Sequence, residues 1–423
     1  MWDFLWHNAM IATMSDDQGF GLITDGAIGV VGGRITWIGP RSELGTDLHS
    51  IAHGVYNADG RVITPGLIDP HTHIVHTEPR WQEFAFRTGH RDEDIPKPNE
   101  FGLMSSVIRT RSTSENELLA HSMKRTHALI AEGVTTVEIK TGYGLDLETE
   151  LKMARVIRHL ADTLPITVIS TFLGAHAIGP EFAGRPDEYI DFLCDVVLPV
   201  LVSHGLVDAV DIFCDARGFS HAQTRRYHQA ARQHGLEFFI HADQYSNFGA
   251  GRLAAELHAR AAAHLEHADA ETAQHLAWAR TTAVLLPGVS WTHNMQAVPP
   301  VHAFREHDVP MALATNCNPG SSVTTSPCTM MNMACQLFGL TVDEALAGFT
   351  RCAAQALGMQ DERGTLEVGK WADLAIWNIS HPAELSVHVG GGQCHAVVKA
   401  GKVIHVNQHL HVPECYRKGQ TVA

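Results

Sequence analysis

The chain has 423 residues, with 31 lysines and arginines against 46 aspartates and glutamates, so its formal charge is 31 − 46 = −15 with histidine neutral. Hydrophobic residues make up 45% of the chain and charged residues 18%, which is ordinary for a globular protein and excludes a disordered or fibrous chain. The acidic balance argues against nucleic acid as a partner, and no apolar run is long enough for a membrane helix.

The two ends of the chain share a pattern of short β-strands. Apolar and small residues alternate from 28 to 37 around a Gly-Gly turn, and residues 374–404 repeat this texture. An isolated hairpin is marginally stable in water. We therefore predict that residues 1–62 and 361–423 pair into one small β-sandwich domain, with the middle of the chain inserted between them.

The middle segment, residues 63–360, alternates short apolar runs with helical stretches, as parallel βα units do. Capping boxes at 114–117 and 341–344 each open a helix, and these helices are expected to end near Gly133 and Gly358. An open doubly wound sheet would normally carry a glycine-rich phosphate turn, which is missing. The pattern therefore predicts an α/β fold with a closed (β/α)8 TIM barrel. The eight predicted strands are 62–68, 135–139, 166–169, 209–213, 238–240, 261–263, 283–286 and 311–314.

The eight cysteines are scattered without a CxxC pair, and the chain begins without a basic segment followed by an apolar stretch. Both features predict reduced thiols in the cytoplasm, and the cysteine spacing argues against a structural zinc ribbon. The sequence leaves the oligomeric state open, and a homodimer is one option.

Histidines gather where predicted barrel strands end. His71 and His73 close the first strand, His241 the fifth and His264 the sixth, while Asn316 follows the eighth. Side chains two residues apart in an extended segment point the same way, so His71 and His73 can face one metal. The carboxyl ends of barrel strands converge at one mouth. Histidines closing three separate strands therefore predict a metal site.

Several segments resemble the signatures of a known family. Residues 65–73 (Pro-Gly-Leu-Ile-Asp-Pro-His-Thr-His) are similar to the first-strand signature of the amidohydrolase superfamily, as is the terminal β domain with residues 369–373. Within this superfamily the chain resembles the imidazolonepropionase family over nearly its full length. The resemblance implies a metal-dependent hydrolase that converts 4-imidazolone-5-propanoate and water to N-formimidoyl-L-glutamate in histidine degradation. The segments that carry it are 137–145, 174–177, 241–244, 264–266 and 318–321.

The same resemblance implies a role for individual residues. One divalent metal, zinc or iron, is implied, because strand 209–213 has neither histidine nor the lysine that binuclear relatives convert to a bridging carbamate. Such a metal lowers the pKa of a bound water to about 7. His264 can orient this nucleophile, and Arg80 can grip the carboxylate of a small anionic substrate through two hydrogen bonds. The implied metal ligands are His71, His73, His241 and Asn316; the implied catalytic residues are His264, Gln244 and Asn316; and the implied substrate-binding residues are Arg80, Tyr143, His176, Gln244, Asn318, Gly320 and Ser321.

Asn316 departs from the family pattern, which carries aspartate at this position. An amide oxygen is a weaker ligand than a carboxylate, and it cannot act as a base near pH 7. Three explanations stay open: an engineered replacement of aspartate that binds without turnover, a natural relative that uses another base such as His264, or a non-catalytic amidohydrolase-fold interaction protein. The retained polar positions favour the first two.

Two further segments depart from the family pattern. Residues 90–99 form a charged stretch where the family has a tyrosine and glycines, and residues 291–294 (Trp-Thr-His-Asn) replace a stretch that carries an arginine. A hydantoin or thiohydantoin propionate is therefore an alternative substrate, and hydrolysis at carbon two of a thiohydantoin would release sulfide. Cys317, beside Asn316, is expected to be a packing thiol.

Overall fold

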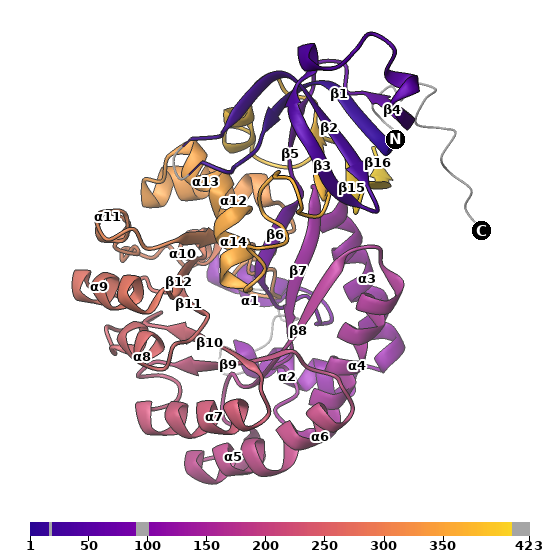
Figure 1. Cartoon of the computed structure of the whole chain (residues 1–423). Helices are drawn as coiled ribbons and strands as arrows, with labels where there is room; N and C mark the ends of the chain where they lie inside the picture. The colour runs from indigo at the N-terminus through magenta and orange to yellow at the C-terminus, as the bar shows by residue number, and fades with distance from the viewer. Residues whose placement is uncertain (17–18, 90–100, 408–423) are drawn as a thin grey trace.

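The computed structural model of the chain describes residues 1–16, 19–89 and 101–407. In Figure 1 the indigo N-terminal strands and the yellow C-terminal strands lie together at the top, and the rest of the chain forms a barrel below them. Within the described ranges, none of the helices combines the length and the apolar character that crossing a bilayer requires.

The barrel consists of eight parallel strands, neighbours in chain order and hydrogen-bonded in sequence from first to last. All eight predicted runs overlap these strands, so the predicted α/β barrel is confirmed. The strands are β6 (Leu67–Thr72), β7 (Val134–Lys140), β8 (Thr167–Ala175), β9 (Ala209–Cys214), β10 (Glu237–Ala242), β11 (Ala261–His264), β12 (Thr282–Leu285) and β13 (Met311–Leu313).

Two main-chain hydrogen bonds lie at the seam where the end of β13 meets the end of β6. The amide of Asn316 donates to the carbonyl of His71 (3.1 Å), and the amide of His73 donates to the carbonyl of Cys317 (3.0 Å). The seam therefore aligns the residues that follow the last strand with the histidines that end the first.

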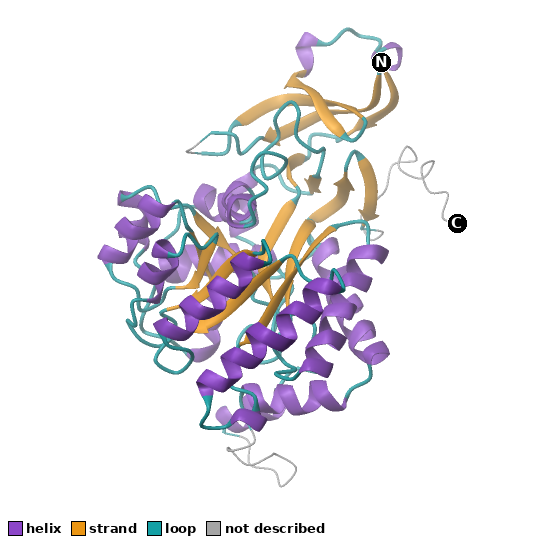
Figure 2. Cartoon of the chain, turned by 60° about the horizontal axis from the view of Figure 1, so that its bottom comes forward, coloured by secondary structure: helices purple, strands orange, loops and turns teal. Residues whose placement is uncertain are grey.

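Helices follow the strands and cover the outside of the barrel, as Figure 2 shows for the purple helices around the orange strands. The helices are α1 (Trp81–Arg87), α2 (Leu103–Ser112), α3 (Glu115–Ala131), α4 (Leu147–Thr163), α5 (Pro186–Phe192), α6 (Leu198–Ser203), α7 (His221–Gln233), α8 (Ala250–Glu256), α9 (Ala270–Ala279), α10 (Pro287–His293), α11 (Val301–Glu306), α12 (Pro327–Met333), α13 (Val342–Gly348) and α14 (Arg351–Ala356).

One predicted helix is divided in two. The capping box at Thr341 and Glu344 is present, but α13 ends at Gly348 instead of continuing to Gly358. The carbonyl of Phe349 accepts a hydrogen bond from the amide of Ile68 in β6 (2.8 Å), and Thr350 has φ −127° and ψ −102°. These angles lie outside the helical region. The bond to β6 draws the chain out of the helix before α14 begins.

The two ends of the chain form a second sheet of eight strands, in which β14 pairs with β5 and β5 with β1. The predicted β domain shared by both termini is thereby confirmed. The predicted strand 62–68 is two strands, because residues 62–65 pair in this sheet while residues 67–72 enter the barrel. The strands are β1 (Trp2–Ala12), β2 (Leu22–Val31), β3 (Arg34–Pro40), β4 (Ala52–Asn57), β5 (Val62–Pro65), β14 (Leu374–Trp377), β15 (Cys394–Lys399) and β16 (Lys402–Val406).

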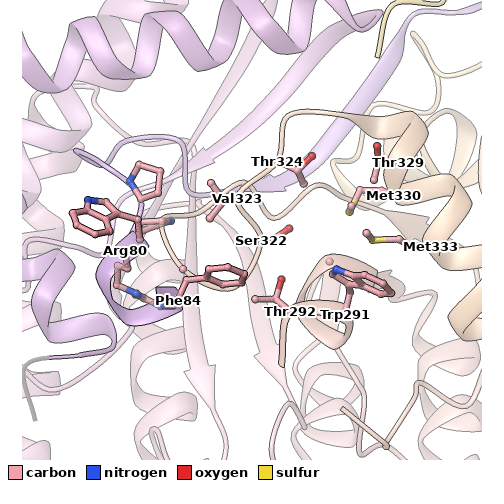
Figure 3. A pocket seen from close by; sticks show the side chains of 15 residues that line it. Arg80, Phe84, Trp291, Thr292, Ser322, Val323, Thr324, Thr329, Met330 and Met333 are labelled. Carbon is pink, nitrogen blue, oxygen red and sulfur yellow. The ribbon is translucent and has the colours of Figure 1, made fainter. Parts of the chain in front are cut away.

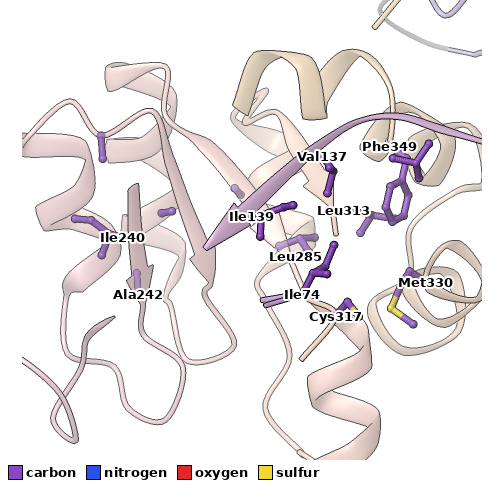
Figure 4. Close-up of a cluster of buried hydrophobic side chains, with 14 of the residues drawn as sticks. Ile74, Val137, Ile139, Ile240, Ala242, Leu285, Leu313, Cys317, Met330 and Phe349 are labelled. Atoms are coloured by element: carbon purple, nitrogen blue, oxygen red, sulfur yellow. The ribbon is translucent and has the colours of Figure 1, made fainter. Parts of the chain in front are cut away.

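Apolar side chains fill the space between the barrel strands and the helices. All seven residues of β7 are buried, because a parallel strand inside a barrel is covered on both faces. Figure 4 shows Val137, Ile139, Leu285 and Leu313 of this cluster packed near Ile74. This packing fixes the strand ends that carry the polar residues described below.

A buried ionic cluster fastens the terminal sheet to the barrel. The carboxylate of Asp373 lies 2.8 Å from Lys399 Nζ and 3.3 Å from Arg363 Nη1. The same two cations reach barrel strands, since Lys399 donates to the carbonyl of Thr135 (3.0 Å) and Arg363 to the hydroxyl of Thr167 (2.7 Å). Asp373 is therefore the shared counter-charge at this junction.

We predict that Asp373→Asn lowers the free energy of unfolding by about 3 kcal/mol, because removing one partner leaves buried charges uncompensated. Chemical denaturation monitored by circular dichroism measures this loss. Glu188→Gln is the control: this exposed carboxylate lies 2.7 Å from Arg185, in a pair outside the cluster, and should change the value by less than about 1 kcal/mol. Equal effects of both substitutions would contradict a specific role for Asp373.

Candidate active site

Three histidines meet at the mouth of the barrel. One nitrogen from each of His71, His73 and His241 lies within 4.8 Å of the other two. His71 is in β6, His73 follows that strand directly, and His241 is in the middle of the barrel sheet in β10. All three are buried, and burial lowers the pKa of each imidazole. They are therefore neutral near pH 7, as metal ligands must be.

These residues fit a divalent metal ion. His71 Nε2, His73 Nδ1, His241 Nε2 and Asn316 Oδ1 are buried polar atoms without a hydrogen-bond partner among the described residues. Leaving such atoms unpaired is costly, so their number at one place points to a ligand. Imidazole nitrogens and an amide oxygen are donors that zinc or iron accepts. Asn316 stays the predicted fourth ligand.

Asp211, on β9, positions His241 from behind. Its carboxylate lies 3.1 Å from Nδ1 of His241, which leaves Nε2 of that ring directed away from it. A carboxylate behind a ligating histidine fixes the tautomer and the orientation of the ring. Burial alone would raise the pKa of Asp211, but His241 and Lys140 bring it below its usual value. Asp211 is thus a buried anion next to the proposed metal ligands.

Lys140 and Glu138, both on β7, complete a buried ionic chain behind the histidines. Lys140 Nζ lies 2.9 Å from Asp211 and 2.8 Å from Glu138, and the three side chains are at most 1% exposed. Glu138 and Lys140 lie in the family-like segment 137–145 but had no predicted role, and Asp211 was not among the predicted site residues. The sequence did carry a signal for them, because charged residues inside otherwise apolar strands indicate buried ion pairs.

A second buried carboxylate holds the seam. Asp69, on β6, accepts hydrogen bonds from the amide (3.1 Å) and the hydroxyl (2.5 Å) of Thr315. Burial raises the pKa of Asp69 to about 7, against these hydrogen bonds. Thr315 precedes Asn316, so this contact helps to place the fourth candidate ligand. Burial also raises the pKa of the Cys317 thiol to about 12, which supports its role as a packing residue.

A cavity of about 360 Å³ opens in front of the histidines. It brings together most of the predicted site residues; His71 is not among its lining residues, and Gly320 lines a neighbouring cavity. The predicted residues that line the first cavity are His73, Arg80, Tyr143, His176, His241, Gln244, His264, Asn316, Asn318 and Ser321. Their contacts with a substrate stay predictions.

Arg80 lies in the loop after β6 and is held from several sides. Its amide donates to the carbonyl of Pro319 (2.7 Å), its Nε lies 3.1 Å from Glu83, and its Nη1 donates to Ser106 (3.3 Å). A Cβ atom on Gly320 would lie 1.7 Å from Nη2 of Arg80. Gly320 is therefore a glycine because the guanidinium packs directly on its backbone.

Asn318 organises the loop after β13. Its side-chain oxygen accepts from the amides of Gly320 (2.9 Å) and Ser321 (2.7 Å), and its nitrogen donates to the carbonyl of Asn316 (2.7 Å). The polar groups of this loop thus bind one another. Asn318 shapes the wall of the cavity beside Arg80.

Two rings border the histidine cluster. His176 Nδ1 lies 3.1 Å from the carbonyl of Gly142, and burial lowers the pKa of His176 to about 3, so the ring is neutral. It stacks on His73 at 5.3 Å, and Tyr143 lies 5.5 Å from it. These flat, neutral groups suit a planar heterocycle with hydrogen-bonding edges.

His264 lies next to His241 and His71. The ring centroids of His264 and His241 are 5.3 Å apart, and His264 Nδ1 lies 3.3 Å from the carboxylate of Glu266. His264 and Asn316 have positive φ values of 78° and 49°. Non-glycine residues in this region store backbone strain, which concentrates at functional sites. His264 and Asn316 are two of the three residues with predicted catalytic roles, and the strain is greater at His264, because asparagine tolerates this region.

A second cavity of about 390 Å³ adjoins the first at Arg80. In Figure 3, Phe84, Trp291, Val323 and Met333 lie around its apolar wall. Residues 291–294, which differ from the family pattern, contribute to both cavities, because Trp291 lines the second and His293 the first. The other such segment, residues 90–99, lies outside the described residues.

Comparison with known proteins shows which family this chain belongs to. The model of the amidohydrolase family matches residues 105–405. The chain is 49% identical to the imidazolonepropionase of Caulobacter vibrioides over 401 residues, which cover 94% of this chain and 99% of that protein. It is 46% identical to the imidazolonepropionase of Cupriavidus pinatubonensis over 402 residues, covering 95% and 94%.

Solved structures share the fold at low sequence identity. The 5-methylcytosine deaminase of Klebsiella pneumoniae aligns with a TM-score of 0.73 at 15% identity, covering 97% of this chain and 99% of that one. A zinc-bound adenosine deaminase of Xanthomonas campestris aligns with a TM-score of 0.67 at 16% identity, covering 99% and 97%. The chain belongs to the amidohydrolase family and, within it, to the imidazolonepropionase family.

We predict that purified protein holds about one metal ion per chain and that His241→Ala abolishes this binding, because it removes one of three imidazole ligands. Elemental analysis after dialysis measures the metal content. His275→Ala, at an exposed histidine of α9, is the control and should keep full occupancy. Full occupancy in His241→Ala would remove the proposed ligand set.

We predict that Asp211→Asn weakens metal affinity by about 10- to 100-fold, because the orienting anion behind His241 is lost. Titration with zinc against a competing chelator measures the affinity. Asp208→Asn, just before β9, removes a carboxylate that pairs with Arg158 (2.6 Å) and should leave the affinity unchanged. Wild-type affinity in folded Asp211→Asn would show that His241 needs no support.

Proposed function

We propose that this chain hydrolyses 4-imidazolone-5-propanoate to N-formimidoyl-L-glutamate, a step of histidine degradation. One observation carries the proposal: Arg80 lines the same cavity of about 360 Å³ as His73 and His241, two members of the histidine cluster. This arrangement offers a cation for a carboxylate arm and a metal centre for a ring carbonyl. The relatives at 46–49% identity that are named imidazolonepropionase support the choice of substrate.

His71, His73, His241 and Asn316 would hold one divalent ion, zinc or iron. When bound, such an ion would lower the pKa of a water molecule to near neutrality, and it would also polarise a carbonyl group. Arg80 binds the propionate carboxylate by charge-assisted hydrogen bonds. His176 and Tyr143 border the planar ring, and Gln244 offers a further hydrogen bond at the same cavity. These contacts orient the ring carbonyl towards the histidine cluster.

Ring opening requires the transfer of protons. The oxygen of water joins the carbonyl carbon, the bond from this carbon to the ring nitrogen breaks, and the nitrogen takes a proton. Asn316 cannot carry that proton. His264 is the neighbouring titratable group, and Glu266 at its Nδ1 orients it (3.3 Å). We therefore assign to His264 the removal of the proton from water and its delivery to the leaving nitrogen.

A hydantoin or thiohydantoin propionate is the second candidate substrate. The observation that favours it is His293, which lines the cavity in a segment that departs from the family pattern. Such a ring presents the same carboxylate to Arg80 with a different atom at carbon two.

The redox state of the thiols supports a reducing compartment. The seven cysteines of the described residues are free. Free thiols are usual where glutathione and thioredoxin keep them reduced, which supports our expectation of the cytoplasm. A homodimer stays a prediction.

We predict that Asn316→Asp raises kcat for 4-imidazolone-5-propanoate by about 10²- to 10⁴-fold, because it adds a general base beside the histidines. The assay compares imidazolone, hydantoin and thiohydantoin propionates with both proteins. His264→Asn should abolish the residual wild-type activity. Sulfide release from the thiohydantoin by the wild-type chain would favour the second substrate, and inactivity of both proteins on all three rings would contradict the proposal.

We predict that Arg80→Ala raises KM by about 10- to 150-fold with unchanged metal content, because a charge-assisted pair contributes about 1.5–3 kcal/mol. Steady-state kinetics and elemental analysis together separate the two effects. Arg87→Ala, at the end of α1, removes an arginine that lies over Phe84 and should keep KM. An unchanged KM in Arg80→Ala would place the carboxylate elsewhere.

A further inference from the structure

Arg217 is a second arginine at the active-site cavity, and the proposed reaction leaves it without a role. It lies in the loop between β9 and α7 and lines the cavity that contains Arg80 and the histidines. Its guanidinium carbon lies 4.7 Å from the centroid of the Tyr245 ring, a cation–π contact. Among the described residues, no carboxylate forms an ion pair with it. Its charge is therefore available to a ligand.

The loop that presents Arg217 is tightly built. Asp215, only 1% exposed, accepts hydrogen bonds from the amides of Tyr245 (2.9 Å) and Arg217 (3.3 Å) and from the hydroxyl of Ser246 (3.1 Å). A Cβ atom on Gly218 would lie 2.3 Å from the carbonyl of Phe213, so only glycine fits there. One buried carboxylate thus ties the arginine loop to the tyrosine loop, which fixes the backbone from which Arg217 extends.

Arg80 and Arg217 both exert their positive charge on Tyr245, which lines the same cavity. Burial and Glu266 raise the pKa of Tyr245, while the positive charges of Arg217 and Arg80 oppose that rise. The phenol therefore lies within the field of two cations. Glu83 partly offsets the charge of Arg80 at 3.1 Å, whereas Arg217 has no such partner in the described part of the chain.

The reaction proposed above changes the charge of its ligand. The substrate carries one carboxylate, which needs one arginine. Water adds across the bond between the ring carbonyl and the nitrogen: its oxygen makes the ring carbonyl a second carboxylate, and the leaving nitrogen takes a proton. The product is thus a dicarboxylate with a five-carbon backbone, and the cavity holds two arginines.

We propose that Arg217 is the binding group for the second carboxylate, so that this cavity recognises five-carbon dicarboxylates. The inference rests on the proposed function for the origin of the second carboxylate. It assigns Arg80 to the carboxylate common to substrate and product, and Arg217 to the one that appears on ring opening.

Glutarate and its monoamide, glutaramate, test this assignment on the metal-loaded protein by isothermal titration calorimetry. The two probes differ only in the second carboxylate. The wild-type chain should bind glutarate about tenfold more tightly than glutaramate, since an exposed charge-assisted pair is weaker than a buried one. Arg217→Met should lose this preference and leave glutaramate affinity within about twofold. Arg217→Lys should restore part of it, because lysine keeps the charge without the planar fork.

Matched variants separate this role from a general effect of charge. Arg34→Met removes an arginine that also stacks on an aromatic ring, Trp371 at 4.2 Å, outside the cavity, and should keep the glutarate preference. Arg80→Met should weaken both probes. Equal wild-type affinity for the two probes, or an unchanged preference in Arg217→Met, would overturn the proposal.

Failure of the proposed function gives a different result. Turnover of 4-imidazolone-5-propanoate with equal affinity for the two probes overturns the role of Arg217 alone. Absence of turnover with a glutarate preference that depends on Arg217 overturns the proposed reaction and supports the dicarboxylate site.

Discussion

The seam between the first and last barrel strands is the constraint on which the site depends. The hydrogen bonds from Asn316 to His71 and from His73 to Cys317 join segments separated by more than 200 residues. They tie the backbone of Asn316 to that of His71, and Asp69 reinforces the join through Thr315. Without this closure, His71 and His73 would have no partner from the far end of the barrel.

The charges around the histidines are arranged in layers. The four candidate ligands are neutral, because burial keeps the imidazoles unprotonated and Asn316 carries no charge. The negative charge lies behind them, in Asp211 and Glu138, with Lys140 between the two carboxylates. Asparagine in place of aspartate therefore makes the buried ionic chain the main compensation for a bound cation on this side of the site.

Much of this could be read from the sequence. Alternating apolar runs predicted the eight barrel strands, and His71, His73 and His241 are brought together as their strand-end positions indicated. The break at Thr350 could not be predicted, because it depends on a hydrogen bond from β6 to Phe349. The roles of Asp211 and Gly320 were also hidden: each depends on a contact with a residue distant in sequence, His241 and Arg80.

The position of Arg80 has a consequence for how this fold changes its ligands. Arg80 lines both cavities, and its guanidinium packs on the backbone of Gly320, so this one side chain lies where the two cavities adjoin. A shorter side chain at position 80 would remove both the cation and the bulk at this junction, without changing the histidines. One substitution at position 80 would thus exchange a group that binds a small anion for space that a bulkier, uncharged ring could fill. This offers evolution a short route to new substrates.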